Sequence, residues 1–281
     1  MESLYDIFSF LELPNIDILD VGASTVDGDP PYHNLKKTGR SRIYGFEPSP
    51  EEYKKLKKLQ NDNEVYLPYA LGDGKKSTLN ICQAPGMTSL LTPDYEILDH
   101  FHGWSQWAEV LETQELQTHR LDDIQEISQV DYVKLDVQGG ELDIILNGKN
   151  ILSNSLVIQT EVNFIPFYEK QPLFAELDLE LRKLGFILHT FAPIKKRAFK
   201  PLMVNNNIYE GINQVMWTDA IYVRSFTDFN LLSSEQLIKI ALILHDLYYS
   251  FDLVMLALKH IDNKEESNLV ALYSEYLLSK K

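Results

Sequence analysis

The chain has 281 residues, with 41 acidic and 26 basic side chains and a formal net charge of −15 at pH 7. Its apolar content of 44% allows a sizeable core, and its length suits one large α/β domain or two smaller ones. Such an acidic chain repels phosphate backbones and anionic headgroups, which argues against nucleic acid or an anionic membrane surface as its partner. One cysteine, Cys82, excludes an internal disulfide. No stretch has the length of a membrane span and the first 13 residues lack a signal peptide's features, so we expect a cytoplasmic protein.

Strands and helices alternate through the first part of the sequence. A short N-terminal helix is expected within residues 1–14. Pro31 suits the first turn of a helix that Gly39 ends, and Ser49-Pro50 is typical of a second helix start. A loop is predicted over residues 25–30. The predicted strands cover residues 16–21, 42–46 and 65–71, with an extra strand or hairpin at 76–82.

The same alternation continues to about residue 230. A helix is expected after Gly139-Gly140-Glu141, and an amphipathic helix over residues 173–184 ends at Gly185. Four further strands are predicted at residues 130–137, 156–162, 186–191 and 220–223. The pattern predicts an α/β domain over residues 15–230, with a mostly parallel seven-stranded sheet and helices on both faces.

Beyond about Leu232 the pattern is purely helical, which defines a C-terminal helical extension over residues 231–281. Ser233 and Gln236 form a capping box, and further helices are predicted over residues 251–260 and 265–279. The extension has more apolar surface than it can bury on itself. It therefore packs either on the α/β domain of its own chain or on the same helices of a second subunit, in a homodimer.

Doubly wound sheets bind their ligand beyond the carboxyl ends of the strands, so the residues that follow strands are the candidates. Gly22 permits close approach of a cofactor, and the Glu47 carboxylate can accept hydrogen bonds from ribose hydroxyls. A nicotinamide dehydrogenase has an acid at the same place. However, the G-x-G-x-x-G fingerprint of a pyrophosphate site is absent, since the next glycine is Gly28. This favours S-adenosylmethionine, which has no phosphates, over a nicotinamide cofactor; an ordinary turn and a surface acid are the structural alternative.

Five short motifs occur in a fixed order: Asp20-Val21-Gly22-Ala23-Ser24, Gly45-Phe46-Glu47-Pro48-Ser49-Pro50, Ala70-Leu71-Gly72-Asp73, Leu121-Asp122-Asp123 and Lys134-Leu135-Asp136-Val137-Gln138-Gly139-Gly140-Glu141. Together they resemble the FkbM family of S-adenosylmethionine-dependent methyltransferases, over roughly residues 15–225. The resemblance implies a Rossmann-like class I methyltransferase fold and a cofactor held by Gly22 and Glu47. With their strand-end neighbours, the expected cofactor-binding residues are Asp20, Gly22, Ala23, Ser24, Glu47, Pro48, Ala70, Leu71, Gly72 and Asp136.

Two features depart from the family pattern. The loop after Gly22 lacks a further glycine close by, which puts contacts to the methionine end of the cofactor in doubt. Gln138 stands where a glutamate is expected, so it is either a neutral substitute or the loss of an acidic function.

Methyl transfer to a hydroxyl requires an aligned acceptor and removal of its proton. Asp136 and Glu161 end two neighbouring strands, and we expect one of them to be the catalytic base or an orienting acceptor. With Asn163 they supply three oxygen ligands, as in catechol-type methyltransferases, which raises magnesium as a second cofactor. A plain hydrogen-bonded acid is the alternative.

The acceptor is not determined by the sequence. The resemblance favours O-methylation of a hydroxyl on a sugar, a glycan or a secondary metabolite; the alternatives are N-methylation of a peptide or small molecule and a noncatalytic cofactor-binding module. Residues 98–115 hold Trp104 and Trp107, and form either a lid over the substrate or a small satellite core. His100 and His102 are too few ligands for zinc. His119 and His189 are expected to be structural.

Overall fold

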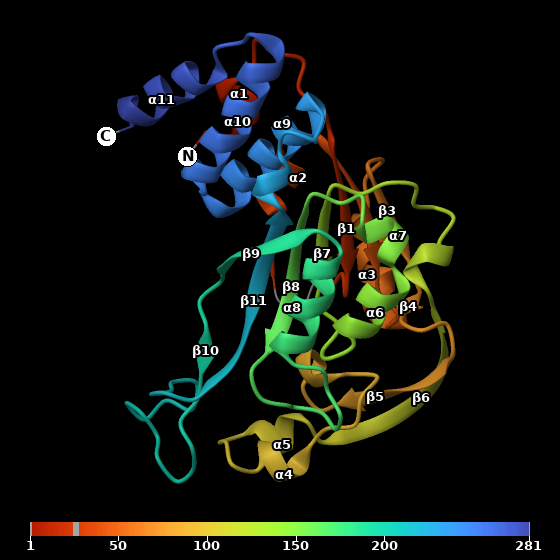
Figure 1. The fold of residues 1–281 in the computed structure, drawn as a ribbon. Helices are drawn as coiled ribbons and strands as arrows, with labels where there is room; N and C mark the ends of the chain where they lie inside the picture. The colour runs from red at the N-terminus through yellow and green to blue at the C-terminus, as the bar shows by residue number, and fades with distance from the viewer. Residues whose placement is uncertain (1, 25–27, 281) are drawn as a thin grey trace.

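A computed structural model describes residues 2–24 and 28–280, so half of the loop predicted over residues 25–30 lies outside the described residues. The main sheet has the strand order β10-β11-β8-β7-β1-β2-β3, and β9 also pairs with β11 (Figure 1). Strands β3, β2, β1, β7 and β8 pair in parallel, and β11 is antiparallel to β8, β9 and β10. These strands are β1 Ile16–Val21, β2 Ser41–Phe46, β3 Glu64–Leu67, β7 Tyr132–Leu135, β8 Val157–Asn163, β9 Phe186–Phe191, β10 Lys195–Lys196 and β11 Val215–Arg224. The predicted mostly parallel sheet is confirmed, with β10 as an additional strand.

A second, three-stranded sheet has the order β4-β6-β5, formed by β4 Ala70–Leu71, β5 Lys76–Cys82 and β6 Val110–His119. The extra strand at residues 76–82 is thus confirmed as β5. The single strand predicted over residues 65–71 is wrong: the chain leaves the main sheet after Leu67 and enters the second one at Ala70. Pro68, which has no N–H to donate, lies at this break.

Helices cover both faces of the main sheet, as predicted. The helices are α1 Leu4–Ile7, α2 His33–Lys37, α3 Pro50–Leu59, α4 Tyr95–Leu98, α5 Trp104–Trp107, α6 Glu141–Asn147, α7 Lys149–Leu152, α8 Phe174–Lys183, α9 Ser234–Ile243, α10 Phe251–Glu265 and α11 Leu269–Ser279, with a π-helical turn, Leu244–Tyr248, after α9. On one face, Leu19 and Val133 of the sheet share a core with Ile144 of α6 and Leu181 of α8. On the other face, which we call the tail face, Ile18 shares a core with α9 and α10.

The C-terminal helices pack on their own α/β domain, which was the first of the two predicted partners. Ile238, Ile240 and Val254 share a core with residues near the amino ends of the parallel strands, such as Tyr132. The predicted capping box is present, since Ser233 N–H donates to Gln236 and Gln236 N–H donates back to Ser233 Oγ. The Lys239 ammonium also contacts the buried Asp131 carboxylate at 3.1 Å. The homodimer stays a prediction.

The N-terminal helix α1 is joined to the same helical layer. Ser3 Oγ and the Leu4 N–H both donate to the Asp246 carboxylate. Figure 1 shows α1, α9, α10 and α11 gathered at one end of the molecule, with β5, β6, α4 and α5 at the other. Across residues 2–24 and 28–280, none of the helices has the length and hydropathy to cross a bilayer.

Candidate active site

A pocket of about 330 Å³ opens at the carboxyl ends of β1, β2 and β7, where the strand order reverses. This is the place at which a doubly wound sheet binds its ligand. Of the residues predicted to hold a cofactor, those that line the pocket are Gly22, Ser24, Glu47, Pro48, Ala70, Leu71 and Asp136. The structure therefore brings together side chains that are more than 110 residues apart in the sequence.

The other three predicted cofactor residues are not among those that line the pocket. Asp20 is buried and accepts hydrogen bonds from Tyr32 Oη at 2.7 Å and from Lys134 Nζ at 3.2 Å. Ala23 packs in a small core beneath α3. A Cβ on Gly72 would meet the Thr118 side chain at 3.2 Å. Their contact with the cofactor stays a prediction.

Gly22 holds the ends of β1 and β7 together. Its φ of +84° is in the left-handed region, and a Cβ there would lie 1.9 Å from the Asp136 carbonyl oxygen. The Gly22 N–H donates to the Phe46 carbonyl, and the Asp136 N–H donates to the Val21 carbonyl. A glycine is thus required at position 22 because a side chain would collide with the Asp136 backbone, whether or not a ligand is bound.

Glu47 lies at the end of β2 and is 8% exposed. Its Oε1 accepts a hydrogen bond from the Ser49 N–H at 2.7 Å, which fixes the carboxyl group in the pocket wall. Burial raises the pKa of Glu47 to about 7, against the opposing effect of that hydrogen bond. The group that is expected to bind the ribose therefore changes charge near neutral pH.

A chain of polar groups crosses the carboxyl ends of β7 and β8. Gln138, which has a φ of 59°, donates from Nε2 to Asp136 Oδ1 at 2.9 Å and to Glu161 Oε2 at 3.4 Å. On its other oxygen, Asp136 is 3.4 Å from Lys134 Nζ. Burial, and then the nearby Asp136 carboxylate, raise the pKa of Glu161 well above its ordinary value, which favours its protonated form.

Asp136 and Glu161 differ in their access to the pocket. Asp136 lines it, whereas Glu161 is 9% exposed and is not among the lining residues. A general base must reach the proton that it removes from the bound acceptor. Of the two candidates, Asp136 is therefore the one placed to contact a ligand in this pocket.

The residues expected to bind magnesium do not fit a metal site. Both Asp136 oxygens already contact Gln138 or Lys134. Asn163 is 2% exposed, and its Nδ2 has no hydrogen-bond partner among the described residues. Within residues 2–24 and 28–280, no group of three or more His, Cys, Asp or Glu side chains is placed to hold a metal ion.

One wall of the pocket comes from a segment that sequence reasoning missed. Residues of β5 and the turn after it contribute, and Ser89 Oγ donates to the Gln138 carbonyl at 2.6 Å. The lining residues of this wall are Leu79, Ile81, Cys82, Pro85, Gly86, Thr88, Ser89 and Leu90, with Gln114 from β6. The strand at residues 76–82 was predicted, but nothing in the sequence indicated that it would form a wall of this pocket.

The aromatic insertion forms a small core beside that wall. Trp104 packs on Phe167 and Trp217, with ring centroids 4.7 and 5.5 Å apart, and Cys82 and Met87 belong to the same core. The predicted satellite core is therefore present.

The two histidines expected to be structural have structural contacts. His119 packs on Tyr69 with ring centroids 4.5 Å apart, and His189 Nε2 is 2.6 Å from Ser250 Oγ. Neither is among the residues that line the pocket.

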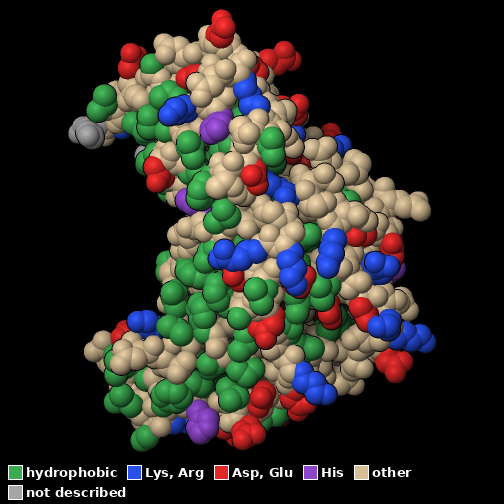
Figure 2. Space-filling model, in the orientation of Figure 1, with side chains coloured by type: hydrophobic (Ala, Val, Ile, Leu, Met, Phe, Trp, Pro, Cys, Tyr) green, Lys and Arg blue, Asp and Glu red, His purple; other side chains and the backbone are tan. Residues whose placement is uncertain are grey.

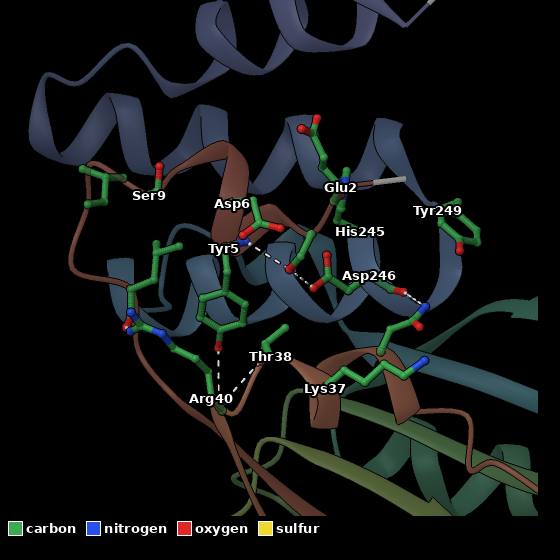
Figure 3. A pocket seen from close by; sticks show the side chains of 14 residues that line it. Glu2, Tyr5, Asp6, Ser9, Lys37, Thr38, Arg40, His245, Asp246 and Tyr249 are labelled. Carbon is green, nitrogen blue, oxygen red and sulfur yellow. Dashed lines mark hydrogen bonds between the residues drawn. The ribbon is translucent and has the colours of Figure 1, made fainter.

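A larger cavity, of about 720 Å³, lies between α1, α2 and the π-helical turn (Figure 3). Its acidic and basic side chains are mixed, with Asp6 and Asp246 near Lys37 and Arg40. The Tyr5 hydroxyl in it donates to the Pro14 carbonyl at 2.7 Å. None of the predicted site residues lines this cavity.

Comparison with known proteins shows which family the sequence resembles. The methyltransferase FkbM domain matches residues 20–188. The 2-O-methyltransferase NoeI of Sinorhizobium fredii (strain NBRC 101917 / NGR234) is 28% identical over 188 residues, which are 62% of this chain and 74% of that protein.

Two solved structures are similar at low identity. Methyltransferase FkbM from Methylobacillus flagellatus KT is 11% identical, with a TM-score of 0.43 over 76% of this chain and 45% of that one. Magnesium protoporphyrin IX methyltransferase (ChlM) from Synechocystis PCC 6803, with bound SAM, is 14% identical, with a TM-score of 0.39 over 78% of this chain and 74% of that one. Because the FkbM domain match spans more than half of the sequence, the chain belongs to the FkbM family of S-adenosylmethionine-dependent methyltransferases.

Proposed function

We propose that this enzyme transfers a methyl group from S-adenosylmethionine to a hydroxyl of a sugar, a glycan or a secondary metabolite. The observation that carries the proposal is the single pocket in which the Gly22 turn, Glu47 and Asp136 meet at three neighbouring strand ends. The FkbM family match supports methyl transfer, and the name of the 2-O-methyltransferase relative supports a hydroxyl acceptor.

The pocket divides into regions suited to different parts of the cofactor. In the proposal, the Glu47 carboxylate accepts hydrogen bonds from the ribose, and the apolar wall of Tyr69, Leu71 and Ile81 contacts the adenine. The turn at Gly22 and Ser24 lies next to the methionine end. The absence of a phosphate-binding glycine loop is consistent with a cofactor that lacks a pyrophosphate.

Asp136 is the proposed proton acceptor. Bound S-adenosylmethionine supplies a methyl group that its sulfonium has already activated. Asp136 takes the proton of the acceptor hydroxyl as the new carbon–oxygen bond forms. Lys134 and Gln138 hold the carboxylate in place and stabilise its charge. Glu161, in its protonated form, accepts a hydrogen bond from Gln138 and so helps to position it; it is not the base.

The proposal is tested by a titration of the protein with S-adenosylmethionine, followed by a screen of glycans, hydroxylated metabolites and peptides for methyl transfer. Mass spectrometry and NMR of the product should show a methyl ether. Methylation of an amine alone would replace the proposal with N-methylation. Tight cofactor binding without transfer to any member of a broad panel would favour the noncatalytic alternative.

A further inference from the structure

The loop between β10 and β11, residues 197–214, is an ordered arm that extends from the edge of the main sheet (Figure 1). Its two sides are joined by backbone hydrogen bonds from Arg197 N–H to the Gln214 carbonyl and from Ala198 N–H to the Glu210 carbonyl. At the tip, Asn205 and Asn206 have φ values of 50° and 56°, which suit a tight turn. We call this segment the arm.

The base of the arm contacts the aromatic insertion, residues 98–115. Phe199 stacks on Phe101 with ring centroids 5.0 Å apart, and Tyr209 stacks on Trp107 at 5.6 Å. The Arg197 guanidinium donates to the Tyr209 carbonyl and lies 5.1 Å from the centre of the Trp217 ring. These contacts hold the arm in one position relative to the active site.

The arm, together with Ile194 just before β10, exposes an unusual set of large apolar side chains. Each of them is between 37% and 60% exposed: Ile194, Phe199, Leu202, Met203, Tyr209 and Ile212. Figure 2, in the orientation of Figure 1, shows hydrophobic side chains gathered at the lower left, where Figure 1 places the arm. Single exposed apolar residues are ordinary, whereas a group on one projecting loop indicates a contact surface.

The charged side chains of residues 194–214 are mostly basic. Lys195, Lys196 and Lys200 are exposed beside it, and Glu210 is the sole acidic residue in the sequence from 194 to 214. The Glu210 carboxylate accepts hydrogen bonds from Asn205 and Asn207. A chain with a net charge of −15 thus has an apolar arm with exposed lysines at and beside its base.

We propose that the arm docks the enzyme on an anionic lipid bilayer. The leucine, isoleucine and methionine side chains enter the headgroup region, and the lysines contact the anionic headgroups, as in other interfacial segments. The convex, projecting shape of the arm suits insertion into a soft interface better than the matching of a flat protein surface. The expectation from net charge, that anionic membranes are repelled, does not hold locally, because headgroup attraction acts within a Debye length of about 10 Å. This inference does not depend on the identity of the methyl acceptor.

The test is flotation of the full chain with vesicles of phosphatidylcholine alone and of phosphatidylcholine with phosphatidylglycerol. We expect the protein to float with the anionic vesicles, to float much less with the neutral ones, and to dissociate as salt is raised. Tryptophan emission should shift on binding, because Trp107 stacks on Tyr209 of the arm.

Variants separate the arm from the rest of the surface. Leu202→Ser combined with Ile212→Ser should weaken vesicle binding on the order of tenfold or more, because two inserted apolar side chains are removed. The matched control is Leu59→Ser with Leu231→Ser, which are 70% and 76% exposed elsewhere and should leave binding unchanged. Lys195→Glu with Lys196→Glu should abolish the preference for anionic vesicles, whereas Lys57→Glu with Lys58→Glu should not.

Circular dichroism and thermal melting confirm that each variant is folded. The proposal is overturned if the wild type ignores anionic vesicles, or if the arm variants bind as the controls do. It is also overturned if light scattering without lipid shows a dimer that the Leu202→Ser, Ile212→Ser variant dissociates, because the arm would then contact a second copy of the chain.

Discussion

At the scale of single residues, Glu47 is buried, yet its proposed role in binding the ribose requires a charged carboxylate. With a pKa of about 7 it is largely ionised at pH 8 and largely neutral at pH 6. Ribose hydroxyls donate to the ionised form, so the affinity for S-adenosylmethionine should fall by about tenfold from pH 8 to pH 6. Glu47→Gln should remove this pH dependence and weaken binding at pH 8 by about 2 kcal/mol.

Isothermal calorimetry at several pH values measures both effects of the Glu47 change. Glu51→Gln, at an exposed acid on the rim of the same pocket, is the control and should keep the pH dependence. Unchanged affinity in a folded Glu47→Gln protein would remove the ribose role.

Asp136 is expected to matter for turnover far more than for cofactor binding. Asp136→Asn preserves the shape of the side chain but removes its ability to take a proton, so kcat should drop about 100-fold or more. The affinity for S-adenosylmethionine should change by only a few-fold. A chelator should not alter the turnover of the wild type, since both Asp136 oxygens are engaged by protein groups.

Two results would revise the Asp136 mechanism. Equal turnover by wild type and Asp136→Asn would exclude Asp136 as the base. Turnover that a chelator abolishes and magnesium restores would return the metal hypothesis.

Gln138 separates two acids, and its neutral amide donates to both of them. Gln138→Glu would place a third carboxyl beside Asp136 and Glu161. The added group would have a folded-state pKa above its unfolded one, so the folded state binds its proton more tightly. Stability relative to wild type should then be nearly retained at pH 5 and fall by about 2 kcal/mol at pH 8.

Urea unfolding at both pH values checks the Gln138 prediction, with the exposed Gln125→Glu as the control. A loss of stability that is larger at pH 5 than at pH 8 would have the wrong sign and would contradict the account of the three carboxyls.

At the scale of elements, the C-terminal helices are required to cover the tail face of the sheet. Truncation after Phe229 would expose the buried Ile18, Tyr132 and Val157, so the shortened protein should aggregate. Ser233→Ala in the full chain removes the cap of α9 and should cost about 1 kcal/mol of stability without changing cofactor affinity.

Light scattering on the truncated chain and denaturant unfolding of Ser233→Ala test this prediction. A soluble, folded truncation that binds cofactor but fails to methylate would move part of the acceptor site into the C-terminal helices. Light scattering of the full chain also decides whether the predicted homodimer forms.

The elements that could be predicted were those with a clear apolar pattern. The central strand β1 is largely buried, and its apolar residues and the glycine that follows it mark both its position and its end. In contrast, β6 is mostly exposed and polar, and its pairing with β5 and β4 defines it. Its sequence therefore has the composition of a loop.

The same difference decides which parts of the site were predictable. The strand-end residues follow from topology, because parallel strands place their carboxyl ends at one edge of the sheet. The wall from β5 and the following turn comes from a separate sheet whose position depends on tertiary packing. The support roles of Asp20 and Gly72 likewise depend on contacts with Tyr32 and Thr118, which no local pattern specifies.

At the scale of the whole molecule, the distribution of charge matters more than its sum. The net charge of −15 describes the chain as a whole, yet Lys195, Lys196 and Lys200 stand beside the exposed apolar side chains of the arm. The partner of a surface is thus set by the residues within a Debye length of it. A class of partner that the net charge of the chain argues against can therefore still bind at a local patch of different charge.

The hydrogen bonds from Ser3 and Leu4 to Asp246 join residues that are more than 240 positions apart. The core on the tail face likewise combines Ile16, Ile18 and Ile43 with Val254 and Ile261. During synthesis on the ribosome, the early strands therefore wait for most of the chain before that face is covered. At a synthesis rate of 5–20 residues per second, about 10 to 50 s pass between the synthesis of β1 and that of the helices that cover it. Throughout this interval the nascent sheet presents apolar surface, so we expect productive folding in the cell to depend on chaperones that bind such surfaces.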